Sequence, residues 1–178
     1  MKQFAKDFYR MTGRKLSWTP RNAVEYIMHH NLRYVCLWRR YTQRPNPFLR
    51  LRLYRYTLKY GLEISPGAII GAGLCLGHPY NITVAEGVRL GKNVNLHKGC
   101  TIGRENRGER MGTPTIGDCV SVGINATIVG NITIGDDVMI APNSFVNFDV
   151  PSHSVVIGNP AVVHKRTNAT ESYVCFCV

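Results

Sequence analysis

Histidines and charged loop residues are the side chains of this 178-residue chain that could do chemistry. His78 stands in the segment 78–81, one of two segments that interrupt an otherwise regular pattern of aliphatic residues. A neutral imidazole can remove the proton of a group that acts as a nucleophile, and a carboxylate can orient the ring. Loops that leave a rigid scaffold are common places for such groups. The segment around His78 is therefore a candidate site for proton transfer.

Metal binding and disulfide formation find no support in the spacing of the ligand residues. The six cysteines include no CxxC pair, and none has a histidine partner at zinc-finger spacing. We therefore expect no metal and reduced thiols that are buried or idle. The chain has no hydrophobic signal core near its start and no run of about 18 apolar residues. These features predict a cytoplasmic protein.

The elements that must position His78 are predicted by an aliphatic repeat with a period of six residues. Such a period is typical of a parallel β-helix, in which each six-residue segment forms one side and three segments close a triangular coil. Small or aliphatic residues follow most ladder positions four residues later, as Val94, Ala126 and Val138 do. The ladder consists of Ile64, Ile70, Leu76, Val84, Leu90, Leu96, Ile102, Ile116, Val122, Ile128, Ile134, Ile140 and Val146.

Two steps of the ladder are too long, and each predicts a loop. The step from Leu76 to Val84 has two extra residues and contains His78, while the step from Ile102 to Ile116 has eight extra residues. The second segment is rich in glycine and arginine and predicts a loop over 103–115 that projects from the coil. Its charges are equally compatible with a solvated surface.

A basic, helical segment precedes the repeat. Residues 1–60 hold 14 lysines and arginines against two acidic residues, a net charge of +12. Thr19 before Pro20 predicts the start of a helix that runs until Pro45, and a second helix follows from Pro47 to a stop at Gly61. These helices are expected to cap the open end of the β-helix or to contact an anionic membrane surface peripherally, with Trp18 and Trp38 at the interface. No motif accompanies the charge that would indicate nucleic-acid binding.

The segments LEISPGAIIGAGLCLGHPYNITV, NVNLHKGCTIG, TIGDCVSVGINATIVGNITIGDDVMIAPNSFV and DVPSHSVVIGNPA resemble the serine acetyltransferases. These enzymes are a branch of the left-handed parallel β-helix, hexapeptide-repeat acyltransferases, and the resemblance covers about residues 62–165. The leader, with KDFYRMTGR, looks more like that of bacterial capsule and exopolysaccharide O-acetyltransferases. The expected fold is mainly β, a left-handed β-helix over 62–166, with a helical leader over 1–61 and a tail over 167–178.

The resemblance implies the roles of the site residues. It places the general base at His78 and its acidic partner at Glu63, where the family usually has Asp; His97 is the second candidate for the base. Acetyl-CoA is the implied co-substrate, bound between subunits of a homotrimer, with no permanently bound cofactor. The positions implied for CoA are Thr101, Gly103, Gly123, Ala126, Ala141, Lys165 and Arg166, and those for the acceptor are Tyr80, Asn81, Arg107 and Arg110.

Departures from the family pattern bear on the acceptor. Serine acetyltransferases carry an Arg-His pair and an Asp that hold the amino acid, and the matching positions here are Gly112, Thr113 and Gly77. The prediction is therefore an O-acetyltransferase that acts on a sugar hydroxyl in polysaccharide biosynthesis. Serine O-acetyltransferase is the alternative, and a non-catalytic trimeric scaffold is the second. The related γ-class carbonic anhydrases need an H-x4-H pair, which this chain lacks.

Overall fold

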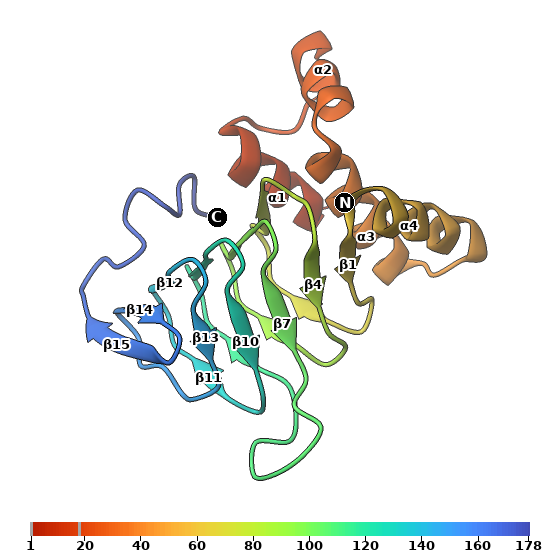
Figure 1. Ribbon diagram of the computed structural model, residues 1–178. Helices are drawn as coiled ribbons and strands as arrows, with labels where there is room; N and C mark the ends of the chain where they lie inside the picture. Colours follow the sequence, from red (N-terminus) through yellow and green to blue (C-terminus); the bar gives the residue numbers. More distant parts are fainter. Residues whose placement is uncertain (1, 18) are drawn as a thin grey trace.

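The computed structural model describes residues 2–17 and 19–178 and shows four helices followed by a parallel β-helix (Figure 1). The helices are α1 (Lys2–Thr12), α2 (Pro20–Met28), α3 (His30–Gln43) and α4 (Pro47–Tyr60). The strands are β1 (Leu62–Ile64), β2 (Ile69–Ile70), β3 (Cys75–Gly77), β4 (Ile82–Val84), β5 (Arg89–Leu90), β6 (Asn95–His97), β7 (Thr101–Gly103), β8 (Thr115–Ile116), β9 (Ser121–Val122), β10 (Thr127–Val129), β11 (Thr133–Ile134), β12 (Val138–Ile140), β13 (Phe145–Val146), β14 (Ser154–Gly158) and β15 (Ala161–Lys165).

Three parallel sheets form the three sides of the coil, as the six-residue repeat predicts. The first side has the strand order β1-β4-β7-β10-β13, the second β11-β8-β5-β2, and the third β15-β14-β12-β9-β6-β3. Each strand pairs in parallel with its equivalent one coil later, except β14 and β15, which form an antiparallel hairpin at the end. The fold class expected from the sequence is confirmed.

The aliphatic ladder forms the interior of the coil. All thirteen ladder residues are at most 6% exposed, and Leu96, Ile128 and Ile140 are fully buried. The residues four positions later, among them Val94, Ala126 and Val138, are buried as well. The first side registers Ile102 against Ile128, so equivalent side chains stack along the coil. Burial of this continuous stack supplies the main stabilisation of the fold.

The helical leader closes the first coil. Trp38 of α3 is 2% exposed and its indole Nε1 donates a hydrogen bond to the Ile64 carbonyl at 3.1 Å. The Tyr34 hydroxyl accepts from the Ile64 amide at 3.1 Å. The expected capping role of the leader is thus visible in its contacts. Because Trp38 is buried, the interfacial role predicted for it is wrong, and Trp18 lies outside the described residues.

The predicted helix from residue 20 to Pro45 is two helices. Thr19 caps the start by accepting from the Asn22 amide at 3.3 Å, as expected. His29, however, adopts an extended conformation that ends α2 and starts α3. The apolar residues Val24 and Ile27 of α2 are 58% and 65% exposed, because α2 stands away from the coil (Figure 1). The apolar spacing alone did not reveal this break.

The second predicted helix is confirmed with its two ends. Asn46 caps α4 by accepting from the Leu49 amide at 2.9 Å, and Gly61 ends it with a φ of 64°. Among the described residues, no helix has the length and apolarity needed to cross a membrane. The outer face of α4 exposes Phe48, Leu51 and Leu58 beside its arginines. Peripheral membrane contact through this face stays a prediction.

The tail over 167–178 lies along the third side of the coil. The Asn95 side chain of β6 donates to the Tyr173 carbonyl at 2.7 Å, and the Asn93 side chain accepts from the Val178 amide at 2.9 Å. Arg10 of α1 links β6 to the tail, since it donates to Asn95 Oδ1 at 2.7 Å and to the Cys175 carbonyl. The tail therefore covers outward-facing residues of this side.

Candidate active site

His78 lies in the turn that connects β3 to β4, at the first interruption of the repeat. The turn contains two non-glycine residues in the left-handed region, His78 with a φ of 49° and Asn81 with a φ of 54°. Such conformations are uncommon and mark a tight change of direction. His78 is exposed, whereas Pro79 is buried beneath the turn. The imidazole of His78 is therefore accessible to a substrate from outside the coil.

The leader helices hold this turn in place. His30 Nε2 is 3.2 Å from the Pro79 carbonyl oxygen, and Asn31 Nδ2 donates to the Leu76 carbonyl at 3.1 Å. At the end of α4, the Tyr60 carbonyl accepts from the Asn81 amide at 2.9 Å. Side chains of α3 and backbone of α4 thus fix both ends of the turn.

An aromatic cluster completes this support. The His30 ring stacks on Tyr60 with ring centres 4.2 Å apart, and Tyr80 meets both rings edge-on. The pKa of His30 is lowered, mainly by burial; the Pro79 carbonyl opposes this, and the nearby Arg33, His29 and Lys59 charges add to it. The neutral ring can donate to the Pro79 carbonyl only as the tautomer that carries its hydrogen on Nε2. His30 could not be identified as a site residue from the sequence, because its partners come from distant segments.

Glu63 lies on β1, the first strand of the first coil. The turn with His78 leads from the end of this coil to β4 in the second coil. The Glu63 Cα is registered against Thr83 of β4, and its side chain is exposed. Glu63 lines a groove of about 590 Å³ between α4 and the first side of the coil, together with Arg50 and Tyr54. Among the described residues, Glu63 and His78 form neither a hydrogen bond nor an ion pair with each other. The role of Glu63 as acidic partner stays a prediction.

His97 lies on β6, one coil after the strand that leads to His78. Its Cα is registered against Gly77, and a Cβ added to Gly77 would come within 2.6 Å of His97 Nδ1. The absence of a side chain at Gly77 therefore makes room for the His97 ring. Burial lowers the pKa of His97, and the neighbouring His78 lowers it further. The neutral form of His97 is therefore favoured, and its ring borders the turn that carries His78. His97 stays the second candidate for the base.

The long loop leaves the first side of the β-helix at the carboxyl end of a strand, whereas the turn with His78 enters that side at the amino end of a strand. The loop follows β7, and the antiparallel bridge between Glu105 and Gly112 closes its base (Figure 1). Arg107 and Arg110 are exposed in it. One chain therefore does not bring these arginines and His78 to one end of the first side.

The positions implied for CoA follow the coil away from the leader. Thr101 and Gly103 lie half-buried on β7, while Gly123 and Ala141 lie at corners. The side chain of Ala126 is fully buried in the core, its carbonyl accepts from the Thr101 amide, and its amide donates to Gly123. The role of Ala126 in binding CoA stays a prediction. Lys165 at the end of β15 and Arg166 after it are exposed.

The cysteines are poor candidates for nucleophiles. All six are free, and burial raises the pKa of Cys100 to about 12 and also raises that of Cys75. A thiolate is the reactive form, so both thiols are disfavoured as acyl carriers. Within residues 2–17 and 19–178, the structure contains no group of three or more His, Cys, Asp or Glu that could hold a metal ion.

Comparison with known proteins identifies the family. The model of the bacterial transferase hexapeptide (six repeats) matches residues 113–147. The structure of serine acetyltransferase from Neisseria gonorrhoeae, in complex with serine, superposes with a TM-score of 0.76 at 30% identity; the match covers 92% of this chain and 68% of that one. The chain belongs to the hexapeptide-repeat transferases.

Curated relatives of this hexapeptide-repeat transferase are serine acetyltransferases. The enzyme of Staphylococcus xylosus is 40% identical over 106 residues, which are 60% of this chain and 49% of the relative. Serine acetyltransferase 2 of Arabidopsis thaliana is 41% identical over 102 residues, 57% of this chain and 32% of the relative. The chain thus spans about half or less of these relatives. The nearer relation to capsule and exopolysaccharide enzymes that the leader suggested is not supported, and the structural match at 92% coverage includes most of the leader.

Proposed function

We propose that the protein is an acetyl-CoA-dependent O-acetyltransferase in which His78 acts as the general base. The observation that carries the proposal is the exposed imidazole of His78 on a turn that the α3 and α4 helices hold from both sides. An exposed imidazole on a rigid support suits proton removal from a bound hydroxyl. The similarity to serine acetyltransferases over the coil supports the same reaction class.

The reaction forms one ester bond and breaks one thioester bond. His78 takes the proton of the acceptor hydroxyl while the oxygen attacks the thioester carbonyl carbon of acetyl-CoA. The tetrahedral intermediate then collapses, the carbon–sulfur bond breaks, and the imidazolium returns its proton to the departing thiolate. Acetyl-CoA is consumed as a co-substrate and CoA is released as the free thiol. Glu63 is proposed to orient His78 and to stabilise the imidazolium.

Serine is the acceptor that the comparisons favour, and a sugar hydroxyl is the second candidate. Serine acetyltransferases are the relatives found, which supports serine. Three positions of the site favour a sugar hydroxyl instead. Gly77, Gly112 and Thr113 offer no charged side chain that could hold the ammonium and carboxylate groups of serine. At Gly77 the space of a side chain is already taken by the His97 ring.

An acceptor assay separates these candidates. We expect free CoA thiol to be released from acetyl-CoA in the presence of an acceptor, and the assay compares L-serine, nucleotide sugars and oligosaccharides. Turnover with serine alone identifies a serine O-acetyltransferase, whereas turnover with saccharides alone supports the sugar reading. Absence of thiol release with every acceptor would leave the non-catalytic scaffold.

The proposed assembly is a homotrimer in which each active site lies between the β-helices of two neighbouring subunits. Among the described residues of one chain, the groove that Glu63 lines includes neither His78 nor Arg107, and we propose that a neighbouring subunit completes the site. We expect light scattering to give three times the mass of the 20.0 kDa chain. A monomer that retains full turnover over a wide range of concentrations would contradict a shared site.

A further inference from the structure

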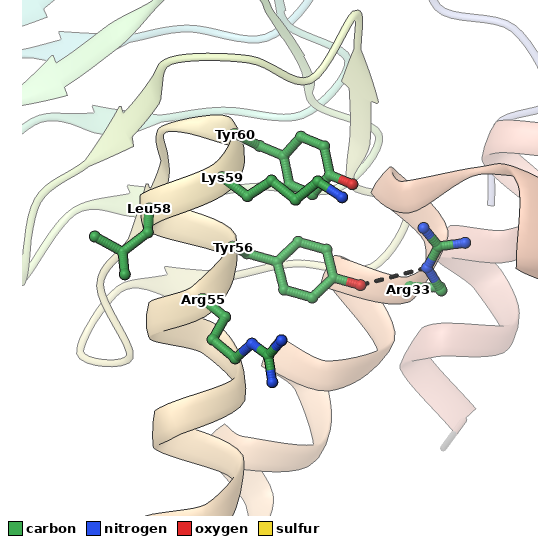
Figure 2. A pocket seen from close by; sticks show the side chains of 6 residues that line it. All are labelled: Arg33, Arg55, Tyr56, Leu58, Lys59 and Tyr60. Atoms are coloured by element: carbon green, nitrogen blue, oxygen red, sulfur yellow. Dashed lines mark hydrogen bonds between the residues drawn. The ribbon is translucent and has the colours of Figure 1, made fainter.

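A hollow of about 420 Å³ on the leader gathers three cationic side chains next to the proposed active site. Arg33 reaches it from α3, whereas Arg55, Tyr56, Lys59 and Tyr60 come from α4. Figure 2 shows the Tyr56 ring between Lys59 and Arg55. The Arg33 guanidinium lies beyond the Tyr56 hydroxyl, to which it is hydrogen-bonded.

The charges of this hollow are not neutralised by acidic side chains. Among residues 2–17 and 19–178, Arg33, Arg55 and Lys59 form no ion pair. Arg33 donates only to neutral oxygens, the Tyr56 hydroxyl and the Tyr26 carbonyl, each at 3.4 Å. Like charges gathered around one hollow repel each other, so a bound anion would be favoured there.

The hollow adjoins the turn that carries His78. Tyr60, which lines it, stacks on His30 with ring centres 4.2 Å apart and lies 5.8 Å from the Tyr80 ring. His30 in turn contacts the Pro79 carbonyl at 3.2 Å. A ligand with its charged group in the hollow therefore lies one layer of side chains away from the turn.

The kind of anion follows from the donor set. Guanidinium groups present paired N–H donors that match phosphate oxygens, and the lysine ammonium adds a compact charge. The Tyr56 hydroxyl accepts from Arg33 Nε, and its own hydrogen is a further donor. Three cations exceed what a single carboxylate such as that of serine would need. A phosphate monoester or diphosphate fits the number of charges better.

We propose that this hollow binds the phosphate or diphosphate group of the acetyl acceptor, and that the acceptor is a phosphorylated sugar or a nucleoside-diphosphate sugar. The proposal rests on the proposed O-acetyltransferase function. The position favours the acceptor over the donor, because the hollow is on the leader side of His78. The positions implied for CoA, such as Thr101 and Ala141, lie on later coils.

Titration calorimetry with inorganic pyrophosphate at low ionic strength tests the binding site directly. The double variant Arg55→Gln/Lys59→Gln is expected to bind pyrophosphate about tenfold or more weakly than the parent, since two charged donors are removed. Arg40→Gln/Arg44→Gln is the matched control, because it also removes two charges and both arginines are exposed and lie outside the hollow. Equal weakening in both variants would indicate general attraction to a chain of net charge +11 and would overturn the proposal.

Two further arms distinguish the source of the phosphate. A uridine-diphosphate sugar is expected to compete with pyrophosphate in the parent, whereas adenosine 3′,5′-diphosphate, which carries phosphates of CoA, is not. Competition by the adenosine compound alone would assign the hollow to the donor and contradict the proposal. Binding does not require turnover, so His78→Ala should bind pyrophosphate as the parent does. A protein that binds pyrophosphate in the hollow but shows no acetyl transfer would contradict only the proposed catalysis. A protein that transfers acetyl groups but does not bind pyrophosphate there would contradict only the proposed phosphate site.

Discussion

His78→Ala is expected to lower the rate of acetyl transfer by about 10²–10⁴-fold while leaving the thermal unfolding transition of the protein unchanged. The loss follows from removal of the base that takes the hydroxyl proton. The fold should tolerate the change, because the side chain is exposed and is not part of the aliphatic core. Free CoA release measures the rate, and circular dichroism measures the unfolding transition.

Two further variants make this result specific. Glu63→Gln should reduce the rate less than His78→Ala, since the base remains and only its orientation and charge stabilisation are lost. His97→Gln tests the neighbouring imidazole, which lies against Gly77. If His78→Ala keeps full activity while His97→Gln loses it, the roles of the two histidines must be exchanged. Full activity of all three variants would remove the proposed mechanism.

The sequence was most informative where structure repeats. One aliphatic residue every six positions determined the coil, because equivalent residues such as Ile102 and Ile128 stack with no freedom in register. The same regularity made the two insertions visible as loops. The helical leader contains no repeat from which the ends of its helices could be predicted in the same way. His29 ends a helix in the middle of an apolar pattern, and only the packing of α3 on the first coil explains which apolar residues are buried.

The site was predicted in part for the same reason. His78 could be proposed from the sequence, because it occupies a break in the ladder. His30, Asn31 and Tyr60 could not, because they reach the turn through contacts between segments far apart in the chain. Arg33, Arg55 and Lys59 are three of the 14 basic residues of the leader, and nothing in the sequence marked them as one group. Their convergence on one hollow depends on how α3 packs against α4.

A buried ion pair fastens the leader to the coil. Asp7 of α1 is fully buried, Arg39 of α3 is 3% exposed, and Arg39 Nε donates to Asp7 Oδ2 at 2.9 Å. Asp7 Oδ1 also accepts from the Gly73 and Leu74 amides at 2.8 and 2.9 Å. Arg39 Nη1 donates to the Ile70 carbonyl at 2.7 Å. Both charges are thus satisfied partly by each other and partly by the backbone of the first coil.

Asp7→Ala is expected to reduce the free energy of unfolding by about 3–5 kcal/mol, because Arg39 would be left as an uncompensated charge in the interior. The two amides of the first coil would lose their acceptor as well, which adds to the penalty. Urea unfolding followed by circular dichroism measures the change, at one fixed protein concentration because assembly contributes to stability.

Arg40→Gln is the matched control for this prediction. Arg40 follows Arg39 on α3 but is exposed, so its replacement should change the free energy of unfolding by no more than about 0.5 kcal/mol. A loss below about 1 kcal/mol in Asp7→Ala would mean that water or another group compensates Arg39. In that case the pair would not anchor the leader. Since α3 also supplies His30 and Asn31 to the turn, loss of this anchor should lower the acetyl-transfer rate at temperatures below the unfolding transition.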